Sequence, residues 1–228
     1  MISNPHKSKF ILFEGIDGSG KSEQYLRIQH YMQAYLPKVT VKYCKEPDVN
    51  RPIGRQVYDI LEGKHPEFKL ENMRAFHMQA FYIEDRMSNY RDNIIAGLQK
   101  GSHVMQDRGV PSSLCYGSET PNDFYDFMGL HNRVFSAAQV PFFWPDLVLI
   151  FDVPAEVAVQ RMLNAGKKLD KFESVAKLTV VRKNYLEFAR AYPNCVVVDG
   201  QFEAKEVFLS TKKYILALLG AEDLSVVK

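Results

Sequence analysis

The stretch that decides the fold is Gly15-Ile16-Asp17-Gly18-Ser19-Gly20-Lys21-Ser22, which follows the apolar run Phe10-Ile11-Leu12-Phe13. It matches the phosphate-loop pattern G-x-x-x-x-G-K-[ST] at every fixed position, and this pattern requires a strand before it and a helix after it. Glycines at these positions let the backbone curl until successive N–H groups form a concave anion site. The start of the following helix adds its positive dipole end. The stretch therefore predicts a nucleoside triphosphate site.

Separate residues of this loop have separate predicted roles. Lys21 can reach the β- and γ-phosphate oxygens, and the Ser22 hydroxyl is placed to bind the Mg²⁺ that accompanies the nucleotide. The alternative is a chance glycine-rich turn, but the amphipathic stretch at 25–32 supplies the helix that the motif demands. The residues predicted to bind the nucleotide are Gly15, Asp17, Gly18, Ser19, Gly20, Lys21 and Ser22.

Composition indicates an ordinary globular protein. With 228 residues, 46% of them hydrophobic, the chain can bury one substantial core. The net charge of +2 comes without a block of like charge, so we expect neither a nucleic-acid surface nor a membrane patch. Three distant cysteines favour reduced thiols over disulfides or zinc. Because residues 1–7 have no apolar signal region and no stretch resembles a membrane span, we expect a cytoplasmic protein.

Five apolar runs alternate with longer stretches of helical periodicity. The runs lie at 9–14, 39–44, 103–107, 147–152 and 195–199. This alternation predicts an α/β fold of the P-loop NTPase type, with three layers (α/β/α) around a five-stranded parallel sheet. Ligands of such sheets bind at the carboxyl ends of the strands. We expect a single domain of this P-loop type over residues 1–228, with a short lid at about 164–175.

The longest predicted helix spans about residues 70–100 and has two distinct faces. Gln79, Tyr82 and Arg86 are spaced i, i+3 and i+7, which places them in one cluster that can line a cleft. The alternative is that Tyr82 packs at a rim and Arg86 is a solvated charge. A neighbouring apolar stripe is predicted to pack on the sheet and contains Met73, Phe76, Ala80, Ile83, Met87, Ile94 and Leu98.

Further short motifs follow the phosphate loop in a fixed order. They are Lys45-Glu46-Pro47, Asp107-Arg108, Ser112-Ser113 with Tyr116, Pro145-Asp146-Leu147 and Asp170-Lys171-Phe172-Glu173. Over about residues 10–187 the chain resembles the thymidylate kinase family. The family pattern is F-E-G-x-[DE]-G-x-G-K-[ST], R-E-P, an aromatic four residues before Arg, D-R, S-x-x-x-[YF], P-D-L and D-R-x-E. The resemblance implies an ATP-dependent, Mg²⁺-assisted kinase that forms dTDP from dTMP or phosphorylates a related deoxynucleoside monophosphate. It also implies a homodimer.

The resemblance assigns roles to the acceptor side of the site. Tyr82 corresponds to the aromatic that stacks on the thymine ring, and Arg86 to the residue that reads a base carbonyl. Arg108 looks like the residue that holds the acceptor phosphate. Ser113 takes the place of a polar residue at the base edge, and Tyr116 matches the ring that crowds the position of a ribose 2′-hydroxyl.

Further residues complete this implied site. Asp17 fits the carboxylate near the 3′-hydroxyl, and Asp107 can hold Mg²⁺ through water. The alternatives are that Asp107 and Arg108 form a helix-capping ion pair and that Ser112 is a helix N-cap. Glu46, Pro47 and Ser112 join the substrate-binding set, and the catalytic set is Lys21, Arg108, Lys171 and Asp17.

The sequence departs from the family at several positions. Gly18 stands where some members have an arginine, so we expect the catalytic cation to come from the lid. The lid offers lysines at 167, 168 and 171 where arginine is usual, and lysine is a point charge without the planar fork. Lys45 replaces the arginine before Glu46-Pro47, and Asp48-Val49-Asn50 replaces the usual Gly-Gly-Thr. Tyr58 stands where the family has a phosphate-binding arginine on the next helix, although Arg51 and Arg55 lie nearby in the sequence. Gly109 stands where a tyrosine or histidine is common.

Two other functions stay open on the sequence. A phosphate acceptor is already ionised and needs no general base, so positioning and charge neutralisation would supply the rate. A deoxynucleoside kinase acts instead on a neutral sugar hydroxyl, with Glu46 as base and Gln79 pairing with a base edge. A nucleotide switch transfers no phosphate, and its N/T-K-x-D string is approached only by residues 167–170.

Overall fold

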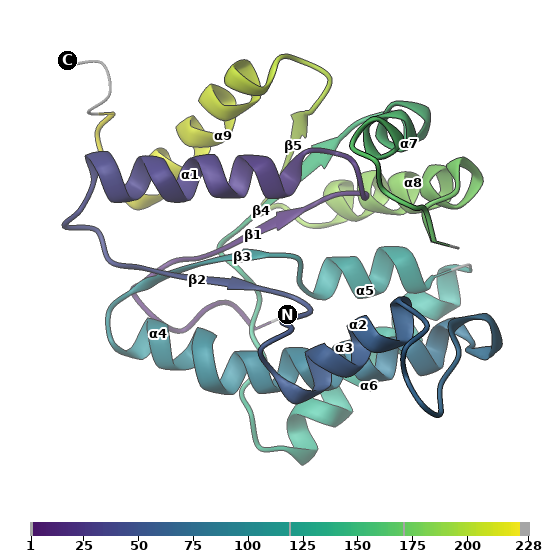
Figure 1. Ribbon diagram of the computed structural model, residues 1–228. Coiled ribbons are helices and arrows are strands. Elements are labelled where there is room, and N and C mark those ends of the chain that lie inside the picture. Colours follow the sequence, from purple (N-terminus) through teal and green to yellow (C-terminus); the bar gives the residue numbers. More distant parts are fainter. Residues whose placement is uncertain (1, 119, 171, 224–228) are drawn as a thin grey trace.

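The predicted apolar runs form one parallel sheet in a computed structural model that describes residues 2–118, 120–170 and 172–223. Within these residues the strand order is β2-β3-β1-β4-β5, and every neighbouring pair is parallel (Figure 1). The predicted α/β fold with a five-stranded parallel sheet is confirmed. The strands are β1 (Phe10–Glu14), β2 (Val41–Lys45), β3 (His103–Asp107), β4 (Leu147–Asp152) and β5 (Cys195–Asp199).

Strand β1 is apolar over its first four residues because helices cover both faces of the sheet. Ile11 and Phe13 pack into a cluster with side chains of α1 (Lys21–Tyr35) and α9 (Ala204–Leu219), which lie together on one face (Figure 1). Phe10 and Leu12 point to the opposite face and join a second cluster. Alternate side chains of one strand therefore serve two cores, as expected for a central parallel strand.

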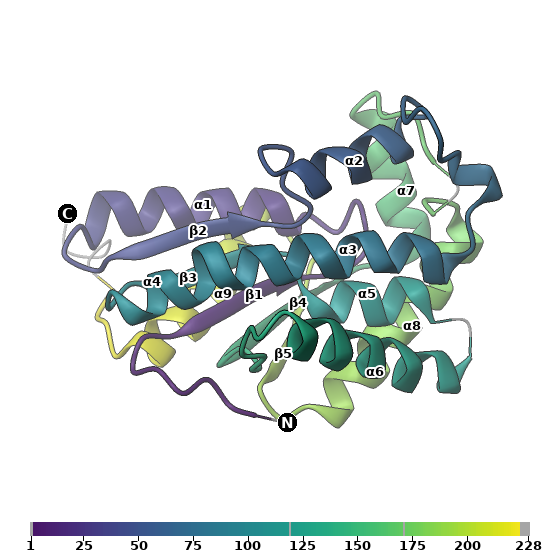
Figure 2. The same cartoon turned by 90° about the horizontal axis from the view of Figure 1, so that it is seen from below.

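The remaining helices build the second face and the rim above the strand ends. Helices α3, α5 and α6 contact one another, and α5 also contacts α8 (Figure 2). Helix α5 begins three residues after β3 ends, so it starts at the carboxyl edge of the sheet, where ligands of such sheets bind. The helices are α2 (Pro52–Leu61), α3 (Ala75–Asn89), α4 (Ala96–Gln99), α5 (Val110–Gly117), α6 (Pro121–Ala137), α7 (Ala155–Asn164) and α8 (Val175–Ala191).

The long helix predicted at 70–100 is divided. A 3-10 helix (Leu70–Asn72) precedes α3, and a π-helix (Tyr90–Ile95) separates α3 from α4. Ile83, Ile94 and Leu98 are buried as predicted, but the prediction is wrong for Phe76, which is 46% exposed, and for Ala80, which is also exposed. The physical reason is that the π-helix and α4 contact the sheet, whereas α3 packs against α2, α5 and α6.

Two further findings bear on the expected environment of the protein. In the described part of the chain, no helix combines the length and apolar character that a membrane span needs. Cys44, Cys115 and Cys195 are free thiols, and the first two are buried.

The phosphate loop packs so tightly that side chains are excluded from two of its positions. Gly18 has φ +79°, and a Cβ there would lie 2.3 Å from the carbonyl oxygen of Ala158 in α7. Gly15 has φ +140°, and its Cβ would lie 2.6 Å from the carbonyl oxygen of Phe151. An arginine at position 18 would therefore require α7 to move, which gives a physical reason for the glycine in this chain.

We predict that Gly18→Ala destabilises the protein more than Gly101→Ala. Gly101 has nearly the same angle, φ +82°, but nothing lies within 4 Å of the place that a Cβ would take there. The left-handed backbone alone should lower the free energy of unfolding by about 1–2 kcal/mol, and the clash at position 18 should raise the loss to about 2–5 kcal/mol. Urea unfolding without nucleotide measures both. Equal losses would contradict the packing against α7.

Candidate active site

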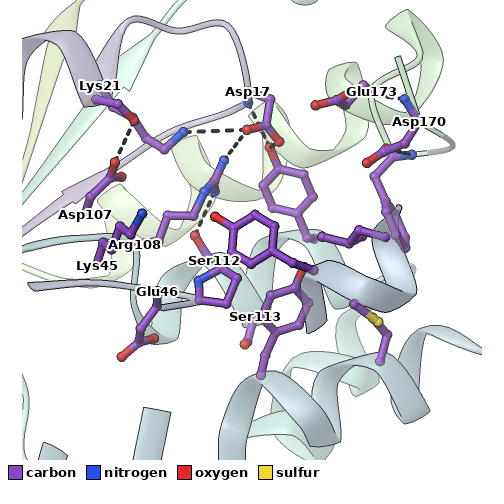
Figure 3. A pocket seen from close by; sticks show the side chains of 18 of the residues that line it. Asp17, Lys21, Lys45, Glu46, Asp107, Arg108, Ser112, Ser113, Asp170 and Glu173 are labelled. Carbon is purple, nitrogen blue, oxygen red and sulfur yellow. Dashed lines mark hydrogen bonds and ion pairs between the residues drawn. The ribbon is translucent and has the colours of Figure 1, made fainter. Parts of the chain in front are cut away.

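A cavity of about 510 Å³ opens at the carboxyl ends of β1, β2 and β3 (Figure 3). The register explains why the motifs meet here, because Phe13 of β1 pairs with Asp107 of β3 and Lys45 of β2 pairs with Asp107 as well. The loop between β1 and α1 contains Gly15, Gly18, Ser19 and Gly20. The predicted residues that line the cavity are Asp17, Lys21, Ser22, Glu46, Pro47, Tyr82, Arg86, Asp107, Arg108, Ser112, Ser113 and Tyr116.

The donor end of the cavity contains Lys21, Ser22 and Asp107. The Ser22 hydroxyl donates to Oδ2 of Asp107 at 2.6 Å. The other oxygen, Oδ1, is buried and has no hydrogen-bond partner within the described residues. A hydroxyl and a carboxylate oxygen suit Mg²⁺, which usually takes few protein ligands and completes its shell with water and phosphate oxygens. These residues therefore fit the ion that a nucleoside triphosphate carries.

The ammonium group of Lys21 lies where it can bind an anion. Its ammonium lies 3.7 Å from Oδ1 of Asp17, and its side chain is almost fully buried. Burial lowers the pKa of Lys21, and the neighbouring charge of Arg108 lowers it further. Negative phosphate oxygens beside Lys21 would favour its charged form.

Asp17 connects the phosphate loop to the acceptor side. Nη2 of Arg108 donates to Oδ1 of Asp17 at 2.6 Å (Figure 3). The Tyr116 hydroxyl donates to Oδ2 of Asp17 at 2.8 Å. Burial alone would raise the pKa of Asp17, but the charges of Arg108 and Lys21 lower it well below its usual range. Asp17 is therefore ionised and bridges two cations.

Arg108 adopts a backbone conformation that aims its side chain into the cavity. Its φ is +66°, its Nη1 donates to the Ser112 hydroxyl at 3.0 Å, and its guanidinium lies 5.2 Å from the centre of the Tyr116 ring. Among the described residues Arg108 pairs with Asp17 and not with Asp107, so the predicted alternative of an Asp107–Arg108 capping pair is wrong. Gly109, not Ser112, is the N-cap of α5, so the capping alternative for Ser112 is wrong too.

Arg86 lies at the floor of the cavity and is 1% exposed, so it is not a solvated charge. Its Nε donates to Glu46 at 2.7 Å, its Nη1 to Ser113 at 2.8 Å, and its Nη2 to the Gly109 carbonyl at 2.8 Å. Nη1 also lies 2.7 Å from the His131 ring, so four of the five N–H donors are engaged. Within the described residues, one N–H on Nη2 is left for a ligand.

Glu46 holds Arg86 in place and is not available as a base. Besides Arg86 it accepts hydrogen bonds from Asn89 at 3.1 Å and Gln106 at 2.8 Å. Its carboxylate points away from Lys21 and Arg108 in Figure 3. The sugar-hydroxyl alternative assigned proton removal to Glu46, so this geometry speaks against that alternative.

Two residues that hold the arginines of the site in place were not predicted from the sequence. The first, Glu14, is fully buried and accepts from the Gly109 amide at 2.7 Å, the Ser112 hydroxyl at 2.7 Å and the Tyr185 hydroxyl at 2.8 Å. It thereby fixes the turn that carries Arg108, and burial raises its pKa. A glutamate directly after an apolar run was a signal for this role.

The second, His131, supports Arg86 from α6. Its Nδ1 lies 2.7 Å from the Phe127 carbonyl and must donate to it, which leaves Nε2 to accept from Arg86. Burial lowers the pKa of His131 to about 3, so the ring stays neutral. Nothing in the local sequence indicates this contact, because the two residues are 45 positions apart.

The segment predicted to be a lid connects α7 to α8. Lys167 and Glu173 form an ion pair, and both line the cavity together with Asp170. Lys171, the predicted lid cation, lies outside the described residues. Tyr58 lines the cavity where the family has an arginine. Arg51 does not replace that arginine, because its guanidinium is bound to Asp85 at 2.8 and 2.7 Å.

A phosphate loop beside further cationic side chains at the carboxyl ends of a parallel sheet is typical of the P-loop kinases. A family model described as thymidylate kinase matches residues 13–210. The chain belongs to the thymidylate kinase family.

Curated proteins from three organisms agree with this assignment. The chain is 30% identical to the thymidylate kinase of Thermosipho melanesiensis, covering 92% of this chain and 98% of the relative. It is 31% identical to the probable thymidylate kinase of Archaeoglobus fulgidus, with 92% and 95% covered. It is 32% identical to the thymidylate kinase of Neisseria meningitidis, with 92% and 97% covered.

We predict that Glu14→Gln lowers the free energy of unfolding by about 2–3 kcal/mol, because a buried amide cannot accept every hydrogen bond made to the carboxylate. Glu23→Gln is the control, since Glu23 is exposed and pairs with Arg27 four residues later. That change should cost no more than about 0.5 kcal/mol. Urea unfolding compares them, and an equally small effect of both changes would refute the proposed support of the Arg108 turn.

Proposed function

We propose that the protein transfers the γ-phosphoryl group of ATP to dTMP and forms dTDP. One observation carries the proposal: Asp17 lies 2.6 Å from Arg108 and 3.7 Å from Lys21, so a donor cation and an acceptor cation share one carboxylate. A phosphoryl group passing between two nucleotides needs cations at both ends of its path. The relatives are thymidylate kinases, and thymidylate is dTMP, so we take dTMP as the acceptor.

The donor side of the site binds and orients ATP. The loop amides between Gly15 and Ser22 cradle the phosphates, and Lys21 neutralises the γ-phosphoryl oxygens. Ser22 and Asp107 would hold Mg²⁺, which when bound neutralises phosphate charge. No general base is required, because the acceptor oxygen is already ionised near neutral pH.

The acceptor side recognises the nucleoside monophosphate. Arg108 holds its phosphate, with Ser112 fixing the guanidinium, and Tyr82 stacks on the base. The free N–H of Arg86 donates to a base carbonyl, and Ser113 lies at the same edge of the base.

The sugar of the acceptor lies beside Asp17 and Tyr116, which are joined by a hydrogen bond. Tyr116 fills the place that a 2′-hydroxyl would take. Glu46 and Pro47 complete this wall, with Glu46 acting through Arg86.

The lid supplies a further cation and excludes water. Lys167 reaches the cavity, and its pKa is raised by Glu173 and Asp17 although partial burial opposes this. Lys171 keeps its proposed catalytic role on the sequence pattern alone. Closure of the lid over both nucleotides would prevent transfer of the phosphoryl group to water.

We expect Lys167→Ala and Lys171→Ala each to lower kcat by about ten- to 100-fold while changing KM less, because a lid cation acts on charge that develops in the transition state. Lys168 is exposed and is not among the described residues that line the cavity, so Lys168→Ala is the matched control and should keep kcat within about twofold. Steady-state kinetics with varied dTMP separates the two parameters. An effect of either lysine on KM alone would assign that residue to binding.

The domain organisation, location and oligomeric state form a further part of the proposal. We propose one kinase domain over residues 1–228 with its lid at 164–175, located in the cytoplasm. We also propose a homodimer formed through α3 and α6, which contact each other and present exposed aromatic side chains. Phe76 of α3 is 46% exposed and Tyr125 of α6 is 75% exposed.

A panel of acceptors tests the proposed reaction. With ATP and Mg²⁺, dTMP should be phosphorylated at least about tenfold more efficiently than dCMP, dAMP or dGMP, which is the scale of one or two specific contacts. Thymidine should not be phosphorylated. Faster turnover of thymidine than of dTMP would identify a deoxynucleoside kinase, and ATP hydrolysis that ignores every acceptor would identify a nucleotide switch.

A further inference from the structure

Gln79 of α3 is a buried side chain whose amide oxygen has no hydrogen-bond partner in the described part of the chain. The residue is 6% exposed, and its Oε1 is fully buried and unpaired. It nevertheless lines the cavity of the active site. Buried polar groups are nearly always hydrogen-bonded, so an unpaired amide beside a ligand site indicates a partner that arrives with the ligand.

The position of Gln79 places it at the proposed base site. It precedes Tyr82 by three residues and Arg86 by seven, so the three side chains share one side of α3. Gly117 of α5 allows the close approach, because a Cβ there would lie 3.1 Å from Cγ of Gln79. Arg86 contacts Ser113, which lies one turn earlier on α5. Gln79 and Arg86 therefore face the same helix, α5, at neighbouring turns of that helix.

We propose that Gln79 reads the N3–H edge of the acceptor base and sets the preference for thymine or uracil over cytosine. This rests on the proposed function, since it assumes a nucleoside monophosphate in the cavity. The edge of thymine offers a carbonyl, an N–H and a second carbonyl in a row. Arg86 can only donate and takes the carbonyl at C4, while the Gln79 amide accepts from N3–H and donates to the carbonyl at C2.

Cytosine cannot satisfy the same two residues. Its N3 and its carbonyl are both acceptors, whereas an amide offers one donor and one acceptor in either orientation. One mismatched pair therefore remains whichever way Gln79 turns. The cytosine amino group also meets Arg86, which has no acceptor. Sites that leave buried polar groups unpaired discriminate strongly against the wrong ligand.

The test compares Gln79→Met and Gln79→Leu with the control Gln99→Met, which makes the first change at an exposed site in α4. Calorimetry measures the Kd of each protein for dTMP, dUMP and dCMP, and thermal unfolding without ligand measures stability. Both Gln79 variants should raise the Kd for dTMP and dUMP about tenfold and that for dCMP less than about threefold, because only the first two lose matched hydrogen bonds. Their Tm should equal or exceed that of the wild type, since an unpaired polar group is removed.

Several results would overturn the proposal. Unchanged Kd values in both variants would do so. An equal rise in the Kd for dTMP and for dCMP would also do so, as would a wild-type protein that binds dCMP as tightly as dTMP. A lower Tm with unchanged binding would show that Gln79 only packs. Binding is measured without turnover, so tight, selective binding of dTMP without its phosphorylation would count against the kinase proposal while leaving the role of Gln79 supported.

Discussion

The ion pair between Asp17 and Arg108 is the interaction on which the rest of the site depends. Asp17 belongs to the loop after β1, and Arg108 follows β3, the neighbouring strand in the sheet. Parallel strands end at the same edge, so the fold brings these two residues together. Arg108 has a left-handed backbone conformation, with φ +66°, and this conformation is strained for a residue that has a side chain.

Each guanidinium in the site is fixed by its own acidic partner. Arg86 is bound by the buried Glu46, while Arg108 is bound by Asp17 directly and by Glu14 through Ser112. Such fixed charges need no reorganisation when the phosphoryl group moves, which is how preorganised sites lower a barrier. Because a carboxylate already compensates each cation, the ligand phosphates enter a site whose geometry is set in advance.

Local patterns in the sequence predicted the strands, the phosphate loop and the residues that meet at the strand ends. The position of Glu14 after an apolar run was a local signal, but its partners were not, and nothing local indicated His131, because the partners of both residues lie on other elements and only the packed fold joins them. Helical periodicity also predicted, wrongly, that Phe76 packs on the sheet. Periodicity shows which side chains share one face of a helix but not which element covers that face. The assigned roles of the site residues, including Lys171, stay predictions.

Two phosphate-binding sites are proposed to face each other across one cavity. The most direct test of this arrangement is the affinity of adenosine and thymidine joined through their 5′ positions by a chain of five phosphates. Because both sites bind parts of one molecule, its Kd should be at least about 100-fold below that of dTMP alone and also below that of ATP. A ligand that binds no more tightly than ATP would contradict two facing sites.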